Sequence, residues 1–338
     1  MSAMSVTIYT VAERAGVSIS TVSLAINHPE RVNETTRRRI VKVAGELGYR
    51  PTGDAAERAR GRQGRIAVVA PFTSYPSYGV RLGGILGEAA QNGVDVVVHD
   101  LASAAASTSP LLDALPVRGS LDGIIIMGLP LSREGIEHLQ EWGPPVVLVD
   151  THEHEFSSVL LDDERGGYLI GRHLVERGHE RVAFVHEAQK SLQYVSAGML
   201  RLSGLKRALD EAGQLEQLSV VESVDATIDG ARAAASRIGD EVTAVFASHD
   251  QLAAGVLAGL RDGRRDTPRD IALAGFDDGP LAQALELTTV RQPFEESGRV
   301  ATRLLLSHAE KPGQSLQRVM LSGELVERRS TSASQSAE

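Results

Sequence analysis

The sequence predicts a small all-α head followed by an α/β core of two doubly wound, parallel-sheet lobes. Two short helical patterns interrupted by one glycine occupy the first 27 residues. From Arg65 onward, short β-branched runs alternate with helical segments, and the chain goes through this pattern twice. A chain of 338 residues is long enough for such a head and for a two-lobed core of roughly 270 residues.

The head contains the stretch AERAGVSISTVSL at residues 12–24, which predicts a helix-turn-helix. Thr10 and Glu13 have the spacing of a capping box, so the first helix is expected to start at Thr10. Gly16 is expected to take the positive φ of a sharp turn, and Ser18 to cap the second helix. Small apolar side chains are expected to form the core between the helices: Ala12, Ala15, Val17, Val22 and Ile26.

The outward face of the second helix predicts contact with DNA. It carries Ile19, Ser20, Thr21, Ser23 and Leu24. The N-terminal end of a recognition helix meets base edges in the major groove, and such a face suits that position. An ordinary helical hairpin is the alternative that so short a pattern leaves open.

The charge distribution favours the DNA interpretation. Residues 1–65 hold eleven Arg and Lys against six acidic residues, a balance of +5, while the whole chain carries −9 and the remainder therefore −14. A basic head on an acidic body concentrates the attraction for phosphates in one place. The basic run at residues 37–39 alone would indicate only a solvated helix face.

A third helix is expected from an Asn33 cap to about Leu47, ended by Gly48 and Pro51. Residues 52–64 are polar, basic and bounded by glycines, which predicts a tether without a fold of its own. The side chains of the third helix that face the other two are expected to be Ile40, Val41, Ala44 and Leu47.

The core pattern predicts two sets of buried parallel strands with helices between them. The first set of strands is expected at 66–70, 94–99, 123–127 and 146–150, with helices near 79–92, 108–115 and 132–142. The second set is expected at 182–186, 220–223, 244–247 and 271–274, with helices near 163–177, 199–212, 227–238 and 250–262. Open doubly wound sheets place their ligand loops at the strand C-termini, where Asp150, His186, His249 and Asp277 fall.

Composition excludes several classes of protein. The chain has no cysteine, which excludes disulfides and thiolate metal sites. No apolar run is long enough to span a bilayer, and residues 1–5 lack the regions of a secretory signal. We therefore expect a cytoplasmic protein without a membrane partner.

Two enzyme-like interpretations have weaker support. The HEHE run at residues 152–155 has an H-x-H pair but no placed third ligand, so a solvated loop is favoured over a metal site. The glycines between Gly79 and Gly87 lack both the G-x-G-x-x-G pattern and a P-loop lysine. We expect no catalytic residue, no metal site and no cofactor.

Longer motifs carry a resemblance over nearly the whole chain. They are TIYTVAERAGVSISTVSLAIN, VNETTRRRIVKVAGELGYRP, DDERGGYLIGRHLVERGHERVAFV, RLSGLKRALDEAG, AVFASHDQLAAGVLAGLRDGRRDTPRDIALAGFDD, LTTVRQP and ELVERRST. Together they resemble the LacI–GalR family of bacterial transcription regulators. The resemblance implies a repressor of double-stranded operator DNA, active as a homodimer and controlled by a small-molecule effector such as a sugar. A periplasmic-type solute-binding protein is the alternative.

The resemblance also implies boundaries. The helix-turn-helix domain is expected at 1–50, the hinge linker at 51–64, and a periplasmic-binding-protein-like core at 65–338. Within the core, the N-lobe is expected at about 65–161 and 292–320 and the C-lobe at about 163–290. The polar tail after Arg329 has no leucine heptads, which favours a dimer over a tetramer.

By resemblance, DNA contacts fall on Thr7, Tyr9, Ser18, Ile19, Ser20, Thr21, Ser23, Leu24, Asn27, Thr36 and Arg58. Leu24 stands where an arginine is common, so a bidentate arginine–guanine contact is not expected there. Arg58 aligns with the family's intercalating leucine in the hinge, and an arginine is a poor apolar wedge.

Effector contacts implied by the resemblance are Arg201, Asp277 and His249, together with Tyr75, Asp150 and Asp225 around them. An arginine can clamp a carboxylate or a pair of hydroxyls, and an aspartate accepts from sugar hydroxyls. Asp225 stands near a place where an aromatic residue is common. The expected pocket is therefore polar.

Overall fold

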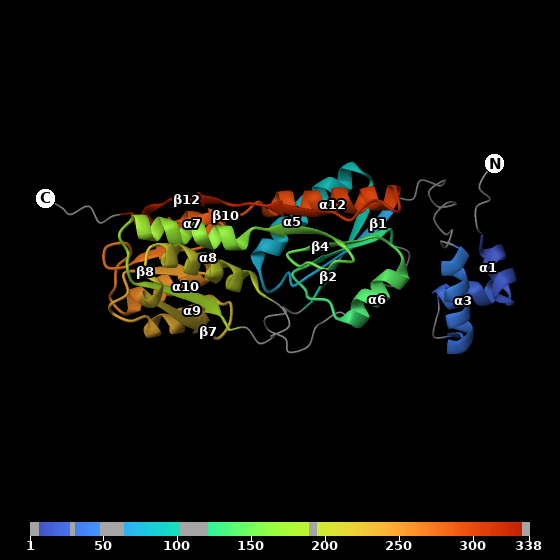
Figure 1. Ribbon diagram of the computed structural model, residues 1–338, viewed down its shortest axis with the longest axis horizontal. Coiled ribbons are helices and arrows are strands. Elements are labelled where there is room, and N and C mark those ends of the chain that lie inside the picture. The colour runs from blue at the N-terminus through green and yellow to red at the C-terminus, as the bar shows by residue number, and fades with distance from the viewer. Residues whose placement is uncertain (1–6, 28–30, 48–63, 102–120, 189–194, 333–338) are drawn as a thin grey trace.

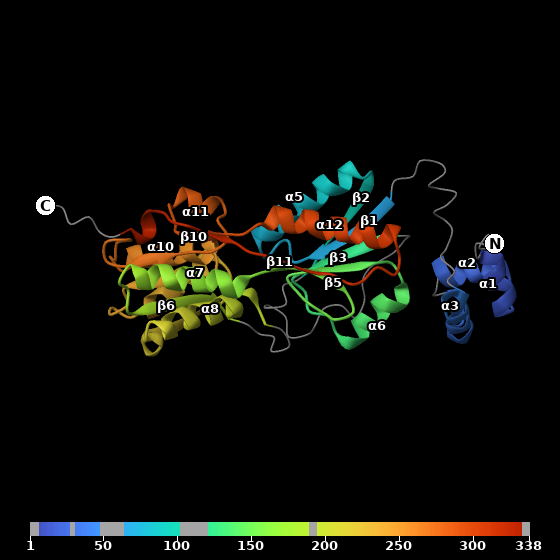
Figure 2. The same ribbon diagram turned by 45° about the horizontal axis from the view of Figure 1, so that its top comes forward.

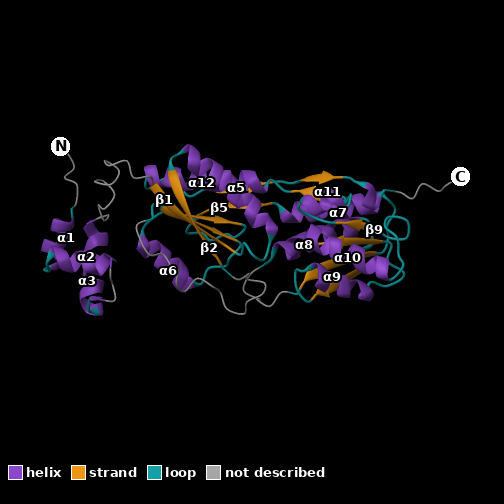
Figure 3. Ribbon diagram, turned by 180° about the vertical axis from the view of Figure 1, so that it is seen from behind, coloured by secondary structure: helices purple, strands orange, loops and turns teal. Residues whose placement is uncertain are grey.

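The structure, a computed structural model, describes residues 7–27, 31–47, 64–101, 121–188 and 195–332. Figure 1 shows a helical head at one end and two α/β lobes that follow one another along the long axis. Viewed from behind, both lobes carry helices on the outside of strands (Figure 3). The predicted fold class is confirmed.

The head consists of α1 (Ile8–Ala15), α2 (Ile19–Asn27) and α3 (Glu34–Leu47). Gly16 ends α1 with φ 64°, and the Ser18 side chain accepts the Thr21 N–H at 3.1 Å, as the sequence predicts. The apolar centre of the head is formed by Val11, Ala12, Ala15, Val22, Ala25 and Ile40.

Two details of the predicted head are wrong. The first helix starts earlier than expected, because Thr7 caps it and Thr10 Oγ1 accepts the Thr7 N–H at 3.4 Å. Val41 is 48% exposed, and Val43 packs toward the core in its place, because the helical period turns Val41 outward. The Ile26 side chain and Gly48 lie outside the described residues.

The N-lobe is built on a six-stranded parallel sheet in the order β2-β1-β3-β4-β5-β11. Its strands are β1 (Gly64–Ala70), β2 (Val94–Asp100), β3 (Gly123–Met127), β4 (Val146–Val149), β5 (Ser157–Leu161) and β11 (Arg318–Leu321). One face packs against α5 (Pro76–Gln91) and α12 (Phe294–Glu310), which lie side by side in Figure 2, and the other against α6 (Arg133–Trp142). β1 begins at Gly64, so this residue belongs to the sheet and not to the predicted linker. The predicted helix at 108–115 lies outside the described residues.

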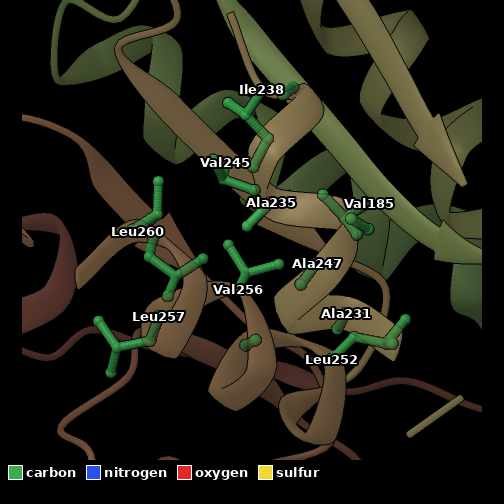
Figure 4. Close-up of a cluster of buried hydrophobic side chains, with 14 of the residues drawn as sticks. Val185, Ala231, Ala235, Ile238, Val245, Ala247, Leu252, Val256, Leu257 and Leu260 are labelled. Carbon is green, nitrogen blue, oxygen red and sulfur yellow. The ribbon is translucent and has the colours of Figure 1, made fainter. Parts of the chain in front are cut away.

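The C-lobe has a four-stranded parallel sheet in the order β7-β6-β8-β9. These strands are β6 (Val182–Glu187), β7 (Leu218–Ser223), β8 (Ala244–Ala247) and β9 (Ala272–Ala274). α7 (Asp163–Glu176) and α8 (Ala197–Glu211) cover one face, while α9 (Ile228–Ala234) and α10 (Asp250–Asp262) cover the other. Figure 4 shows the second of these cores, where Val256 and Leu260 meet Val245 and Ala235.

The chain passes between the lobes three times. It crosses from β5 to α7, then from β10 (Thr289–Arg291) to α12, and finally from β11 to β12 (Glu324–Val326). β10 and β12 pair antiparallel, and bridges at Thr288 and Arg291 tie the first of them to the C-lobe. A short helix, α11 (Pro280–Ala284), precedes β10. Strand β5 and the helices and strands after Ala274 were not predicted from the sequence.

Glycines let the paired helices of each lobe approach closely. A Cβ at Gly204 would lie 1.9 Å from the Glu164 carbonyl oxygen, and one at Gly167 would lie 2.0 Å from that of Arg201. Gly84 and Gly298 have the same relation across α5 and α12. The crossing of α7 and α8 therefore fixes where Arg201 sits relative to the start of α7.

We expect Gly204→Ala to lower the free energy of unfolding by about 1–3 kcal/mol, because the added methyl pushes α7 from α8. Gly87→Ala is the control, since Gly87 is exposed in α5 and an added Cβ would have nothing within 4 Å. That control should be neutral or stabilising by up to about 1 kcal/mol. Urea unfolding of both variants measures the difference, and equal effects would contradict a packing role for Gly204.

Candidate ligand cleft and nucleic-acid interface

The predicted DNA-contacting residues lie on the three helices of the head. Thr7 and Tyr9 are at the start of α1, Ser18 caps α2, and Thr36 lies in the first turn of α3. The positions of α2 run from Ile19, 42% exposed, through Ser20, Thr21, Ser23 and Leu24 to Asn27. Arg58 and the Asn27 side chain lie outside the described residues.

Hydroxyl groups at the start of α2 order its outward face. The Ser18 hydroxyl lies 2.8 Å from Ser20 Oγ and 2.7 Å from Thr21 Oγ1. Tyr9 is 67% exposed on the neighbouring helix. The start of α2 thus presents backbone N–H groups and hydroxyls, which suit phosphate contacts, beside an exposed apolar Ile19.

A second set of polar residues gathers where the two lobes meet, and Arg201 lies at its centre. Arg201 Nε donates to Asp163 Oδ1 at 2.8 Å, and its NH1 donates to the Ser248 carbonyl at 2.5 Å. NH2 lies 3.6 Å from Asp277 Oδ1, and the guanidinium stacks 3.9 Å from the centre of the Phe276 ring. The helix crossing at Gly167 and Gly204 brings Arg201, from α8, onto the first residue of α7.

The N-lobe supplies a matching pair. Arg81 of α5 forms an ion pair with Asp150 at 2.5 Å, and its side chain is 3% exposed. The Arg81 guanidinium stacks 4.2 Å from the centre of the Phe294 ring, at the start of α12. Burial raises the pKa of Asp163 and Asp277, which belong to the other lobe, and the charge of Arg81 opposes this rise. The two ion pairs therefore interact electrostatically across the junction between the lobes, which is called the cleft below.

Crossing segments connect these pairs. Asp163 opens α7 directly after the first crossing, and Gln292 lies in the second crossing. Gln292 Nε2 donates to Asp163 Oδ1 at 3.3 Å. Any ligand that moves Asp163 or Gln292 therefore acts on the segments that connect the lobes.

Two of the predicted effector residues have left-handed backbone. Asp150 has φ 60° and Asp277 has φ 109°, values that non-glycine residues rarely adopt. Such strained positions cluster at binding sites, where the surrounding structure holds them. Each aspartate leaves one side-chain oxygen, Oδ1, buried and without a hydrogen-bond partner among the described residues.

His249 caps α10 and is held neutral. Its Nδ1 accepts the Leu252 N–H at 3.4 Å, which leaves the proton on Nε2. Burial, together with the charge of Arg201, lowers the pKa of His249 to about 3. Nε2 is buried and has no hydrogen-bond partner in the described part of the chain. It is a donor available to a ligand.

Burial also shifts two aspartates of the C-lobe. It raises the pKa of Asp277 to about 7, against the opposing charge of Arg201. Asp250, whose Oδ1 accepts from the Thr289 hydroxyl at 2.9 Å, has its pKa raised to about 6 for the same reason. The C-lobe side of the cleft therefore holds carboxyl groups that are readily protonated near neutral pH.

Tyr75 lies between the two lobes, whereas Asp225 lies on the surface at the start of α9. Tyr75 precedes α5, donates its hydroxyl proton to Glu187 of the C-lobe, and packs its ring 6.4 Å from that of His249. Asp225 is exposed, and its carboxylate accepts the Thr227 N–H at 2.9 Å. Thr227 is the residue that caps α9. The charge of Asp225 reaches Glu187, whose pKa is raised chiefly by burial. His186, expected at the C-terminal end of its strand, is the penultimate residue of β6.

The sequence did not single out several residues of the cleft. Asp163 starts α7, Gln292 lies in a crossing, Arg81 lies in the second turn of α5, and Glu187 ends β6. The one available signal for Arg81 was a charged residue in an otherwise apolar and glycine-rich helix, YGVRLGGILG.

Comparison with known proteins agrees with this arrangement. Residues 7–52 match the model of bacterial regulatory proteins of the lacI family, and residues 172–331 match a periplasmic binding protein-like domain. Catabolite control protein A of Priestia megaterium is 31% identical over 91% of this chain and 94% of its own length. The chain belongs to the LacI family.

Other LacI-family relatives extend the comparison. The transcriptional regulator DegA of Bacillus subtilis is 30% identical over 97% of this chain and 99% of its own. A regulator from Enterococcus faecium with bound ribose superposes with a TM-score of 0.71 at 27% identity, covering 79% of this chain and 98% of that one. The lac repressor dimer bound to operator has a TM-score of 0.67 at 25% identity, with 97% and 99% covered.

This LacI-family chain is a DNA-binding transcriptional regulator with an effector-binding core. A solute-binding protein without a regulatory role is not supported, because the match includes the DNA-binding head. The relatives named above are regulators and not enzymes. In the described parts of the chain, no helix has the length and apolarity needed to cross a membrane.

The raised pKa of Asp277 predicts a pH dependence of stability. The folded state keeps this proton up to about pH 7, whereas the unfolded chain loses it near pH 4. The folded state therefore binds more protons, and this group makes stability fall as the pH rises through that window. In Asp277→Asn the loss of stability between pH 5 and 7 should be smaller, by up to about 1.4 kcal/mol per pH unit.

Urea unfolding at several pH values measures this difference. Exposed Asp210 of α8 provides the control, because Asp210→Asn should leave the pH profile unchanged. A wild-type profile that rises from pH 5 to 7 as steeply as that of Asp277→Asn would contradict the assignment.

Proposed function

We propose that this regulator is a cytoplasmic repressor whose dimer binds operator DNA and whose DNA affinity is set by a sugar or related metabolite bound between the lobes. The proposed division is a DNA-binding domain at 1–50, a hinge linker from 51 to 63, one residue shorter than predicted because Gly64 opens β1, and an effector-binding, dimerising core from 64 to 338. The proposed role is binding and not catalysis.

One observation carries the proposal: the polar cluster lies on the segments that connect the lobes. Asp163 and Gln292 are hydrogen-bonded to each other, and each belongs to a different crossing. A ligand that contacts Arg201 or Asp277 acts on this junction and changes the angle between the lobes. Such a change alters how the two heads of a dimer meet their half-sites, for a coupling free energy of about 1–3 kcal/mol.

Support for a sugar effector comes from relatives and from the cleft itself. Solved LacI-family structures include one with bound ribose and one in complex with cellobiose. In this chain the proposed effector contacts are Tyr75, Asp150, Arg201, Asp225, His249 and Asp277. Carboxylates, a guanidinium and a neutral imidazole are groups that hydrogen-bond to hydroxyls.

DNA binding through the head should depend strongly on salt. We expect the full-length protein to bind duplexes selected from genomic fragments with a log–log salt slope of about −0.9 per phosphate contact. Ser20→Glu should abolish binding, because it places a carboxylate on the outward face of α2. Gln217→Glu adds the same charge to an exposed position of the C-lobe and should leave affinity unchanged. Salt-insensitive binding, or equal loss in both variants, would refute this use of the head.

The effector response should be separable from DNA binding. Asp277→Ala and Arg201→Ala are expected to abolish the response to a sugar that shifts the wild type, while both still bind the operator. Arg207→Ala, an exposed arginine of the same helix, should respond normally. Gel mobility with and without sugar measures both properties, and far-ultraviolet circular dichroism verifies folding. An unchanged response in both cleft variants would show that the effector binds elsewhere.

A further inference from the structure

The charges of the cleft are already paired with one another. Arg81 lies 2.5 Å from Asp150, and Arg201 lies 2.8 Å from Asp163 and 3.6 Å from Asp277. The four side chains of the Arg81–Asp150 and Arg201–Asp163 pairs are each 15% exposed or less. The flat faces of both guanidiniums are also covered by phenylalanine rings. Neither arginine is therefore available as a free cation.

The cleft can still bind a ligand through hydrogen bonds. Among the buried side-chain atoms that have no hydrogen-bond partner in the described residues, five belong to the cleft residues discussed above: Arg81 Nε, Asp150 Oδ1, Asp277 Oδ1, His249 Nε2 and Gln292 Oε1. Donors and oxygen acceptors are mixed in this set, and it draws on both lobes and on a crossing. A buried polar atom left without a partner is costly, which favours a ligand that satisfies it.

Resting on the function proposed above, we propose that the cleft selects an uncharged, hydroxyl-rich effector and rejects its phosphorylated or carboxylated derivatives. Arg81 is a specificity residue in this scheme, and Asp150 is the group that keeps it from binding anions. Hydroxyl groups both donate and accept hydrogen bonds, so they match this mixed set of donors and acceptors that have no hydrogen-bond partner.

Charged ligands fit this cleft poorly for a physical reason. An anion must displace a carboxylate from its guanidinium, and the displaced carboxylate is then buried without a partner. Asp150 and Asp163 already neutralise the two arginines, so no net positive charge is left to attract an added anion. A cationic ligand must compete with the arginines for the same carboxylates. An uncharged polyol leaves every ion pair in place.

The first test compares matched ligands on the full-length protein. Titration calorimetry at constant ionic strength is performed with ribose, cellobiose and glucose, with ribose 5-phosphate, glucose 6-phosphate and glucuronate, and with glucosamine as the cation. Each charged derivative should bind at least about tenfold more weakly than its uncharged parent. Tighter binding of a phosphate ester, a uronate or glucosamine would overturn the inference.

The second test does not require the natural effector. For the wild type, the melting temperature in low millimolar inorganic phosphate should equal that in chloride of the same ionic strength. In Asp150→Asn, Arg81 loses its counter-ion, and phosphate should raise the melting temperature of this variant. Asparagine tolerates the left-handed backbone at this position, so the substitution removes charge without adding strain.

Asp210→Asn is the matched control, since it removes one exposed carboxylate from α8 and should gain no response to phosphate. Phosphate stabilisation of the wild type, or none in folded Asp150→Asn, would overturn the inference. If no ligand of the panel binds while the phosphate test gives the expected result, the sugar effector of the proposed function fails and the exclusion of anions stands.

Discussion

The buried ion pair between Arg201 and Asp163 is the constraint on which the two-lobed core depends. Both side chains are less than a tenth exposed, so their charges are stabilised by each other and by fixed neighbours. Removing one partner of such a pair costs about 3–5 kcal/mol, because the other is left buried and uncompensated. The pair joins α8 to the start of α7, where the chain has just entered the C-lobe.

Several contacts fix the position of this pair on the C-lobe side of the cleft. The approach of α7 and α8 at Gly167 and Gly204 sets the position of the guanidinium, and Phe276 covers its face. Asp163 accepts in addition from Gln292, which belongs to another crossing. Packing, charge and chain connectivity thus converge on one carboxylate, and the proposed ligand-binding atoms of the C-lobe are arranged around it.

Local patterns were sufficient to predict most of this architecture. The strand at 123–127, the strand at 244–247 and the helix at 250–262 agree with β3, β8 and α10 to the residue, because each is an apolar pattern bounded by polar residues or glycine. Strand β5, which begins Ser157-Ser158, was missed because its buried serines depend on partners distant in sequence, as in the contact of Ser157 with His308. The start of α1 was predicted at Thr10 because Thr10 and Glu13 have the spacing of a capping box. Thr7 and Thr10 have the same spacing and also carry capping groups, and this earlier pair starts the helix.

Most of the predicted effector residues lie in loops after strands, whereas Arg201 lies in α8 and was identified through a sequence motif. The residues that sequence reasoning missed act through tertiary contacts. Arg81 is six residues into a helix, and only the fold brings it to Asp150. Asp225 follows β7 in the chain, and its side chain accepts the N–H of Thr227, the residue before α9. Sequence spacing identifies which loops meet at a sheet edge, whereas the pairing of charges across two lobes depends on packing.

The interleaved route of the chain also governs the order in which the protein can be built on the ribosome. The N-lobe core includes Ala301, Leu304 and Leu305, so the nascent N-lobe lacks one wall until synthesis has passed the whole C-lobe. The C-lobe in turn waits for Ser330, whose hydroxyl donates to the Leu273 carbonyl at 2.6 Å. The N-lobe is complete only after β11, which ends at Leu321, and the C-lobe only after Ser330. A truncation before β11 therefore damages both lobes at once, whereas the described core of the head is finished early in translation.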